Sequence, residues 1–155
     1  MGKSNYFFDK TQIIRYHFYI SFFRLKMVER LAEYFKQKAI LIVDDDYVSA
    51  LLLQEHLRPL NTELLVAHTT CDAINLFKTN PKIALVLLDI KFHVGNGYEV
   101  AKQMRVLNPE VILIAQTALA IEEERQKLIN SCFNSYIFKP ILSNVLFDTI
   151  LKNIL

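Results

Sequence analysis

The sequence predicts an α/β protein with a doubly wound, five-stranded parallel sheet and an extra helical segment at its N-terminus. From residue 39 onward, short apolar runs alternate five times with segments whose apolar residues recur at helical spacing. The runs at 40–43 and 83–88, for example, contain no polar residue, which is typical of strands buried on both faces of a sheet. Alternating strands and helices imply parallel strands, right-handed crossovers and helices on both faces.

Length and composition are those of one ordinary domain. The chain has 155 residues, of which 52% are hydrophobic and 22% charged, so a substantial core can form. The net charge of +2 gives no reason to expect direct binding of nucleic acid. The three glycines form no phosphate-binding loop, which argues against dinucleotide-binding and P-loop functions.

The element boundaries follow from the apolar runs and their stop signals. Strands are expected at 40–43, 63–67, 83–88, 111–115 and 136–138. Helices are expected at about 47–58, from 70 or 71 to near 80, beyond Gly97 with Val100 and Leu107 on its apolar face, at about 121–130 and at about 143–154. Pro59, Pro81 and Pro109 end three of these helices, because proline cannot continue a helix.

Residues 1–38 differ from the domain that we expect at 39–155, because they are aromatic and basic. The longest uncharged run, Tyr16 to Phe23, is far shorter than the roughly 20 apolar residues of a membrane span. A small-residue cleavage site, which a signal peptide requires, is missing. From about Lys26 to Lys38 the apolar residues recur at helical spacing, so the extension is expected to be partly helical.

Several interpretations of this extension stay open. It is a helix packed on the domain or on a second copy of the chain, or the remnant of an upstream module. Alternatively, Met27 is the true start of the protein. A helix lying on a membrane surface is a lesser alternative, since basic and aromatic residues mix in such helices.

Polar groups follow four of the five expected strands. They are Asp44, Asp45, Asp46, Asp89, Thr117 and Lys139. The carboxyl ends of parallel strands meet at one edge of the sheet, so these groups are expected to converge.

Carboxylates hold hard cations such as Mg²⁺, and an ammonium group binds a phosphoryl group as a point charge. Asp89 stands alone on its loop and can act as a nucleophile. Each residue also has an ordinary explanation, such as Asp46 capping the next helix, but their combination favours phosphoryl chemistry.

Five segments resemble the receiver domain of two-component response regulators. They are Ile-Leu-Ile-Val-Asp-Asp-Asp at 40–46, Val-Leu-Leu-Asp-Ile-Lys at 86–91, Asn-Gly-Tyr-Glu-Val at 96–100, Ala-Gln-Thr-Ala at 115–118 and Tyr-Ile-Phe-Lys-Pro-Ile at 136–141. The resemblance covers residues 39–155 and implies a flavodoxin-like sheet with strand order 2-1-3-4-5. The chain departs from the family pattern at Phe92-His93, where the family usually has Met-Pro. His93 itself is expected to be a loop residue.

The resemblance implies a role for each residue of the site. Asp89 accepts a phosphoryl group from a phosphohistidine on a partner. Mg²⁺ is held by Asp45 directly, by Asp44 through water, by Asp89, and by the backbone carbonyl of Lys91. Thr117 moves toward the phosphoryl group, Tyr136 changes rotamer with it, and Lys139 pairs with the phosphate.

The resemblance also implies partners and a location. The phosphoryl donor is a sensor histidine kinase or a phosphotransfer protein, and a downstream protein reads the surface formed by 121–130, 136–138 and 143–154. A second copy of the chain is a further expected partner, and a membrane is not. The protein is expected in the cytoplasm, where it catalyses its own aspartyl phosphorylation and dephosphorylation without being a conventional enzyme. It also resembles the terminal receiver of a hybrid sensor kinase.

Two other functions remain open. Asp44-Asp45-Asp46-Tyr47-Val48 matches the Asp-x-Asp-x-Val signature of haloacid-dehalogenase-type phosphatases, in which Asp44 would be the nucleophile. The acidic pair that this family carries beyond the fourth strand is replaced by Gln116-Thr117. The third interpretation is a receiver used only for docking, without phosphorylation.

Overall fold

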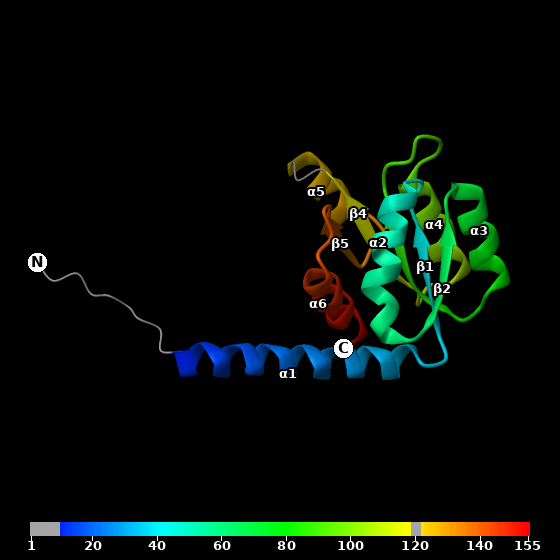
Figure 1. The fold of residues 1–155 in the computed structure, drawn as a ribbon. Coiled ribbons are helices and arrows are strands. Elements are labelled where there is room, and N and C mark those ends of the chain that lie inside the picture. The colour runs from blue at the N-terminus through cyan, green and yellow to red at the C-terminus, as the bar shows by residue number, and fades with distance from the viewer. Residues whose placement is uncertain (1–9, 119–121) are drawn as a thin grey trace, which may run out of the picture.

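A computed structural model describes residues 10–118 and 122–155 of the chain. The expected helix start at Ile121 lies outside these residues. Five parallel strands form one sheet in the order β2-β1-β3-β4-β5, which confirms the predicted fold class and strand order (Figure 1). The strands are β1 Ala39–Val43, β2 Glu63–Ala67, β3 Ile83–Asp89, β4 Ile112–Thr117 and β5 Ser135–Phe138.

Helices follow each of the strands, as the alternation predicted. They are α2 Tyr47–Leu57, α3 Thr70–Thr79, α4 Gly97–Leu107, α5 Glu122–Ile129 and α6 Ser143–Ile154, preceded by α1 Lys10–Phe35. Residues Arg58–Leu60 form a short 3₁₀ turn, η1, so α2 ends one residue before its expected limit. Proline at the second position of that turn explains the stop, because it lacks the N–H of the next helical bond.

Side-chain caps fix where three helices begin. Asp46 accepts a hydrogen bond from the backbone N–H of Val48 at 3.0 Å and therefore caps α2. This confirms the ordinary explanation of Asp46 as a helix cap. Thr69 caps α3 in the same way, and Asn96 accepts from Tyr98 N–H at 2.9 Å at the start of α4. The helices that flank the site therefore start at defined residues next to the strand ends.

The core lies in two layers, one on each face of the sheet. Ile40 and Ile42 of β1 point toward α1, α2 and α6, whose residues pack against them in a single cluster. Leu41 and Val43 point to the other face, where α3 and α4 pack. Successive side chains of β1 point to opposite faces of the sheet, and both faces are covered by helices. This is why the strand carries no polar residue.

The N-terminal helix is longer than the sequence predicted. The expected helix began near Lys26, whereas α1 starts at Lys10. Its C-terminal part packs on the domain through Met27, Leu31 and Phe35, all of them buried. Its N-terminal half extends away from the sheet (Figure 1). Large apolar residues occur on several sides of that half, so its periodicity gave no clear helical signal.

None of the helices within the described residues combines the length and apolarity that crossing a membrane requires.

Candidate functional site

The site lies at the carboxyl ends of the two central strands. Val43 and Leu88 are register partners on β1 and β3, and Asp44 and Asp89 are the next residues on their strands. Asp44, Asp45 and Asp89 each place a carboxylate oxygen within 4.8 Å of the other two. The structure thus brings together three acids that 45 positions separate in the chain, as the strand topology predicted.

Lys139 joins two of these acids. Its ammonium nitrogen lies 2.8 Å from Asp44 Oδ2 and 2.5 Å from Asp89 Oδ2. The Lys139 side chain is 21% exposed, that of Asp89 11%, and that of Asp44 is fully buried. Charge-assisted hydrogen bonds of this length are strong, and burial reduces their screening. The loop between β5 and α6 is therefore tied directly to the ends of β1 and β3.

Burial and pairing act in opposite directions on the acids and the lysine. Burial raises the pKa of the Asp44 carboxyl above its ordinary value, against the hydrogen bond from Lys139. Burial also disfavours the charged form of Lys139, but its hydrogen bonds to Asp44 and Asp89 outweigh this and raise its pKa. Lys139 therefore stays protonated at neutral pH and balances one of the negative charges.

Backbone N–H groups hold the second oxygen of each paired carboxylate. Asp44 Oδ1 accepts from the backbone nitrogen of Asp46 at 3.0 Å, and Asp89 Oδ1 accepts from that of Lys91 at 2.8 Å. Both carboxylates are thereby fixed in orientation, with one oxygen toward Lys139 and one toward the following turn. Such preorganisation is what a metal or phosphoryl site requires.

His93 contacts the third acid, which the sequence analysis did not anticipate. Its backbone nitrogen and its imidazole Nδ1 both lie 2.7 Å from Asp45 Oδ2. Partial burial of Asp45 raises the pKa of its carboxyl, but the hydrogen bonds from His93 outweigh this effect and lower that pKa. The same contact raises the pKa of the His93 imidazole. His93 stands where the family usually has Met-Pro, so that departure was the one sequence signal for this contact.

Thr117 lies on β4, which neighbours β3, and Tyr136 lies on the edge strand β5. Thr117 ends β4, one residue beyond the register partner of Asp89, and is fully buried. The backbone carbonyl of Thr117 accepts a hydrogen bond from the backbone N–H of Lys139 at 2.8 Å. This bond links the end of β4 to the loop between β5 and α6, which carries Lys139. Tyr136 is half-buried on β5, with its ring 5.4 Å from that of Phe138 in an edge-to-face arrangement. Their side chains are near the site without joining the acidic cluster, whose members are Asp44, Asp45 and Asp89.

Gln116 is a buried polar residue whose significance the sequence did not reveal. It pairs in register with Asp89 and is completely buried. Neither its side-chain nitrogen nor its oxygen has a hydrogen-bond partner among the described residues. Gln116 also lines a cavity of about 370 Å³ together with Lys139 and residues of α2. A buried amide without partners is unfavourable, so Gln116 lowers the stability of the fold.

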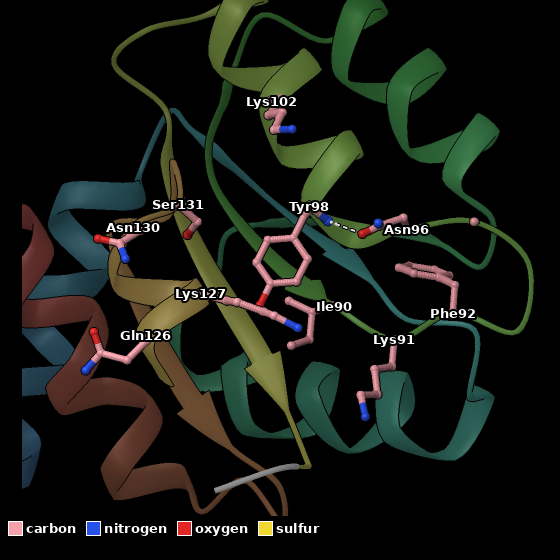
Figure 2. Close-up of a pocket in the computed structure, with 11 residues that line it drawn as sticks. Ile90, Lys91, Phe92, Asn96, Tyr98, Lys102, Gln126, Lys127, Asn130 and Ser131 are labelled. Atoms are coloured by element: carbon pink, nitrogen blue, oxygen red, sulfur yellow. Dashed lines mark hydrogen bonds between the residues drawn. The ribbon is translucent and has the colours of Figure 1, made fainter. Parts of the chain in front are cut away.

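A groove of about 860 Å³ connects the Asp89 loop with α5 (Figure 2). Ile90 and Lys91, which follow Asp89 in the chain, line it on one side, together with Lys127 of α5 and Asn130 just beyond that helix. Figure 2 shows the Tyr98 ring among these residues, with the Lys127 side chain reaching toward Ile90. A change in the Asp89 loop can therefore reach α5 through side chains that share this groove.

Gly97 allows α4 to approach the carboxyl end of β3 closely. A Cβ atom at this position would collide with the backbone of Asp89 and Ile90. The glycine is needed here for close approach, since any side chain would push α4 away from the site. It thus contributes to the position of the Asp89 carboxylate from outside the acidic cluster.

The donor set fits magnesium. Three carboxylates face one ammonium group, so negative charge is in excess at the site. All of the candidate side-chain ligands are carboxylate oxygens, which hard divalent cations prefer. Three carboxylates leave coordination positions of the metal open for water or phosphate oxygens. Nitrogen and sulfur ligands, which would favour zinc, are not part of the cluster.

Comparison with known proteins gives the family. The model of the response regulator receiver domain matches residues 40–151. Sensor histidine kinase RcsC from Escherichia coli (strain K12) is 32% identical over 111 residues, which are 72% of this chain and 12% of the kinase. The chain therefore spans only about an eighth of the length of such curated relatives.

Solved structures of similar fold include a CheY-like receiver domain protein from Methanospirillum hungatei JF-1. It has 28% identity and a TM-score of 0.68, covering 74% of this chain and 91% of that one. The Saccharomyces cerevisiae receiver domain of Ssk1, solved with the phosphotransfer protein Ypd1, is 26% identical with a TM-score of 0.68. That match covers 75% of this chain and 88% of the other. The strand order, the site at the strand ends and the family match agree, and the chain belongs to the receiver domain family of response regulators.

Proposed function

We propose that the protein is a phosphorylation-dependent signalling domain in which Asp89 accepts a phosphoryl group from a phosphohistidine. The observation that carries this proposal is the position of Lys139, whose ammonium bridges Asp89 and Asp44 at the strand ends. A lysine at this place can neutralise a phosphoryl group on Asp89, and the carboxylate oxygens beside it suit a divalent cation.

The transfer needs no residue beyond those at the site. The bond between the phosphorus and the imidazole nitrogen of the partner breaks as a bond forms to a carboxylate oxygen of Asp89. Mg²⁺ held by Asp45, Asp89 and the Lys91 carbonyl, with Asp44 acting through water, would neutralise charge on the phosphoryl oxygens. Later attack by water on the phosphorus would break its bond to the carboxylate oxygen, release inorganic phosphate and return Asp89 to its free form.

Phosphorylation would reach the surface through two routes. Thr117 and Lys139 are linked through the main chain, so a shift of either toward the phosphoryl group moves the ends of β4 and β5. The groove at Ile90 links the Asp89 loop with α5. Tyr136 lies on β5 between these elements, and we propose that its ring changes rotamer in the same transition. The surface of α5, β5 and α6 would then present a changed shape to a downstream protein.

The partners follow from the chemistry and from the relatives. A phosphohistidine is carried by a histidine kinase or by a phosphotransfer protein, and the Ssk1 receiver domain is solved in complex with one such protein, Ypd1. The match to a short part of RcsC suggests an origin in a hybrid kinase. We propose a cytoplasmic location, where such kinases present their phosphohistidine.

Burial argues against the phosphatase alternative. Asp44 would be the nucleophile there, but its side chain is fully buried. Asp89 keeps 11% exposure at the edge of the site. Attack requires a carboxylate that the phosphoryl donor can reach, so Asp89 is the better nucleophile.

The test is incubation with Mg²⁺ and acetyl phosphate, followed by mass spectrometry to locate a base-labile adduct. We expect one phosphoryl group on Asp89, its loss in Asp89→Asn, and normal labelling of Asp72→Asn, which removes an exposed acid of α3. A label on Asp44, or repeated hydrolysis of phosphate esters, would indicate a phosphatase. Bound Mg²⁺ with no label would indicate a docking domain.

A further inference from the structure

The N-terminal half of α1 leaves a row of apolar side chains uncovered. Ile14, Phe18, Phe22 and Leu25 are between 52% and 74% exposed. They are spaced by four, four and three residues, so they form one continuous stripe along the helix. An exposed stripe of large apolar residues is characteristic of a protein contact.

This stripe lies on the side of α1 that faces away from the domain. Phe18 and Met27 are separated by about 2.5 helical turns, so they project in opposite directions. Met27 is buried in the core, and Arg24 donates to Ser143 of α6 at 3.3 Å on the domain side. Within the described residues the domain therefore leaves Phe18 uncovered, and a second molecule can pack against it.

Helix stability gives a second reason to expect a partner. On the part of α1 that extends past the domain, the stripe is exposed within the described residues, and short isolated helices are marginal in water. Burial of the stripe against another helix would provide the missing stabilisation. Figure 1 shows free space around this half of α1, so a second helix can approach it.

The charges along α1 indicate which second helix fits against it. From Lys10 to Val28 the chain has four lysine or arginine residues and no acidic one, and the first acids of α1 are Glu29 and Glu33. A parallel pair of identical helices would place like charges side by side, whereas an antiparallel pair places basic against acidic.

Phe22 is the natural centre of such an antiparallel pair. Arg15 precedes Phe22 by seven residues and Glu29 follows it by seven, about two turns in each direction. Both therefore flank the same face as Phe22, and Arg15 of one copy meets Glu29 of the other. Glu29 now pairs with Lys26 at 3.0 Å in an exposed contact, which is weak enough to rearrange.

We propose that the protein forms a two-fold symmetric dimer through antiparallel pairing of α1, with Phe22 at the axis and Arg15 paired with Glu29 of the second copy. The contact spans residues 14–29, about 24 Å of helix. An interface of this size is small, so the dimer dissociates readily on dilution. It uses the face of α1 opposite the sheet and leaves the phosphorylation site free.

The test is sedimentation equilibrium of the full chain over a range of concentrations. We expect the mass to rise from that of one 18.1 kDa chain toward twice this value. Phe18→Asp and Phe22→Asp should each weaken the association at least tenfold. Val106→Asp, which places the same charge on an exposed apolar position of α4, should leave it unchanged. Circular dichroism checks that each variant is folded.

A charge exchange tests the orientation. Arg15→Glu and Glu29→Arg should each weaken the dimer, and the double variant should restore it. A dimer that the double variant does not restore would overturn the antiparallel arrangement. A wild-type chain that stays monomeric at all concentrations would overturn the dimer itself, as would a monomer that binds vesicles of anionic lipid through this stripe.

The dimer and the phosphorylation are tested separately. Asp89→Asn removes the phosphoacceptor without touching α1, so it should dimerise like the wild type. Phe22→Asp should still be labelled on Asp89. A dimer that is lost in Asp89→Asn would contradict an interface made by α1.

Discussion

His93 binds Asp45 with two nitrogen atoms at once, since its backbone nitrogen and its imidazole Nδ1 both lie 2.7 Å from Asp45 Oδ2. The imidazole is 92% exposed, whereas the carboxylate is 17% exposed. Asp45 is also one of the three acids that suit a divalent cation. A protonated His93 and a metal ion would therefore compete for the same carboxylate.

We predict that His93→Ala binds Mg²⁺ more tightly than the wild type, by about two- to fivefold near pH 6. The contact with Asp45 raises the pKa of His93 above its ordinary 6.5, so the imidazole is charged below that point and neutral well above it. The advantage of the variant should accordingly shrink as the pH rises toward about 9. Calorimetric titration with Mg²⁺ at several pH values measures this. An advantage that is independent of pH would contradict competition by the imidazolium.

Gln116→Met should stabilise the protein. Gln116 is fully buried and both polar atoms of its side chain lack hydrogen-bond partners within the described part of the chain. Methionine has a similar length and no amide to desolvate, so we expect a gain of about 1–3 kcal/mol in the free energy of unfolding. Thermal unfolding of the unphosphorylated protein should show a midpoint higher by several degrees. Gln103→Met changes an exposed glutamine of α4 and serves as the control. A lower midpoint for Gln116→Met would mean that water satisfies the amide.

Lys139→Met should destabilise the protein when Mg²⁺ is absent. The substitution leaves Asp44 and Asp89 ionised and close together without their cation. Removing one partner of a buried pair costs about 3–5 kcal/mol, and the partial exposure of Lys139 places this case nearer 2–3 kcal/mol. Urea unfolding with and without Mg²⁺ measures the loss, and Mg²⁺ should recover part of it.

The pH dependence of that loss has a definite sign. Burial already raises the pKa of Asp44 above 3.8 in the folded protein, so ionised Asp44 costs stability as the pH rises. Without Lys139 this cost grows, and it should be largest at neutral pH. The difference between Lys139→Met and the wild type should narrow as the pH falls toward 3.8 and Asp44 becomes protonated. A difference that stays the same at every pH would show that the lysine stabilises the fold by packing alone.

Leu31→Ala should cost about 2–5 kcal/mol, although Leu31 lies in the N-terminal extension. Its side chain is fully buried in the cluster that α1, α2 and α6 share with the sheet. Glu33→Ala, two residues further along on the exposed side, should change stability by less than about 0.5 kcal/mol. Urea unfolding of both variants is the measurement. Equal stabilities would mean that α1 does not contribute to the folding of the domain.

The sequence was informative wherever local patterns and topology act together. Unbroken apolar runs identified the central strands, and stop signals such as Pro109 located helix ends to within a residue or two. The convergence of Asp44, Asp45, Asp89 and Lys139 could be predicted because parallel strands place their carboxyl ends at one edge. Asp46 as a helix cap was also predictable, since capping depends on the neighbouring residues alone.

The sequence could not give features that depend on non-local distances. The contact of His93 with Asp45 links residues 48 positions apart and depends on the path of one loop. Within the described residues the side chain of Gln116 has no hydrogen-bond partner, and this depends on the residues of α2 and of the Lys139 loop that pack around it. The length of α1 was underestimated because its N-terminal half is apolar on several sides, which hides the helical period.

The sequence by itself determined the α/β class, the order of elements and the residues that meet at the sheet edge, because these follow from periodicity and from the direction of parallel strands. The tertiary structure alone decided how each carboxylate is paired, which apolar residues of α1 are buried, and which stay exposed for another molecule. Pairing and burial depend on distances between segments far apart in the chain, and those distances exist only once the helices have packed on the sheet.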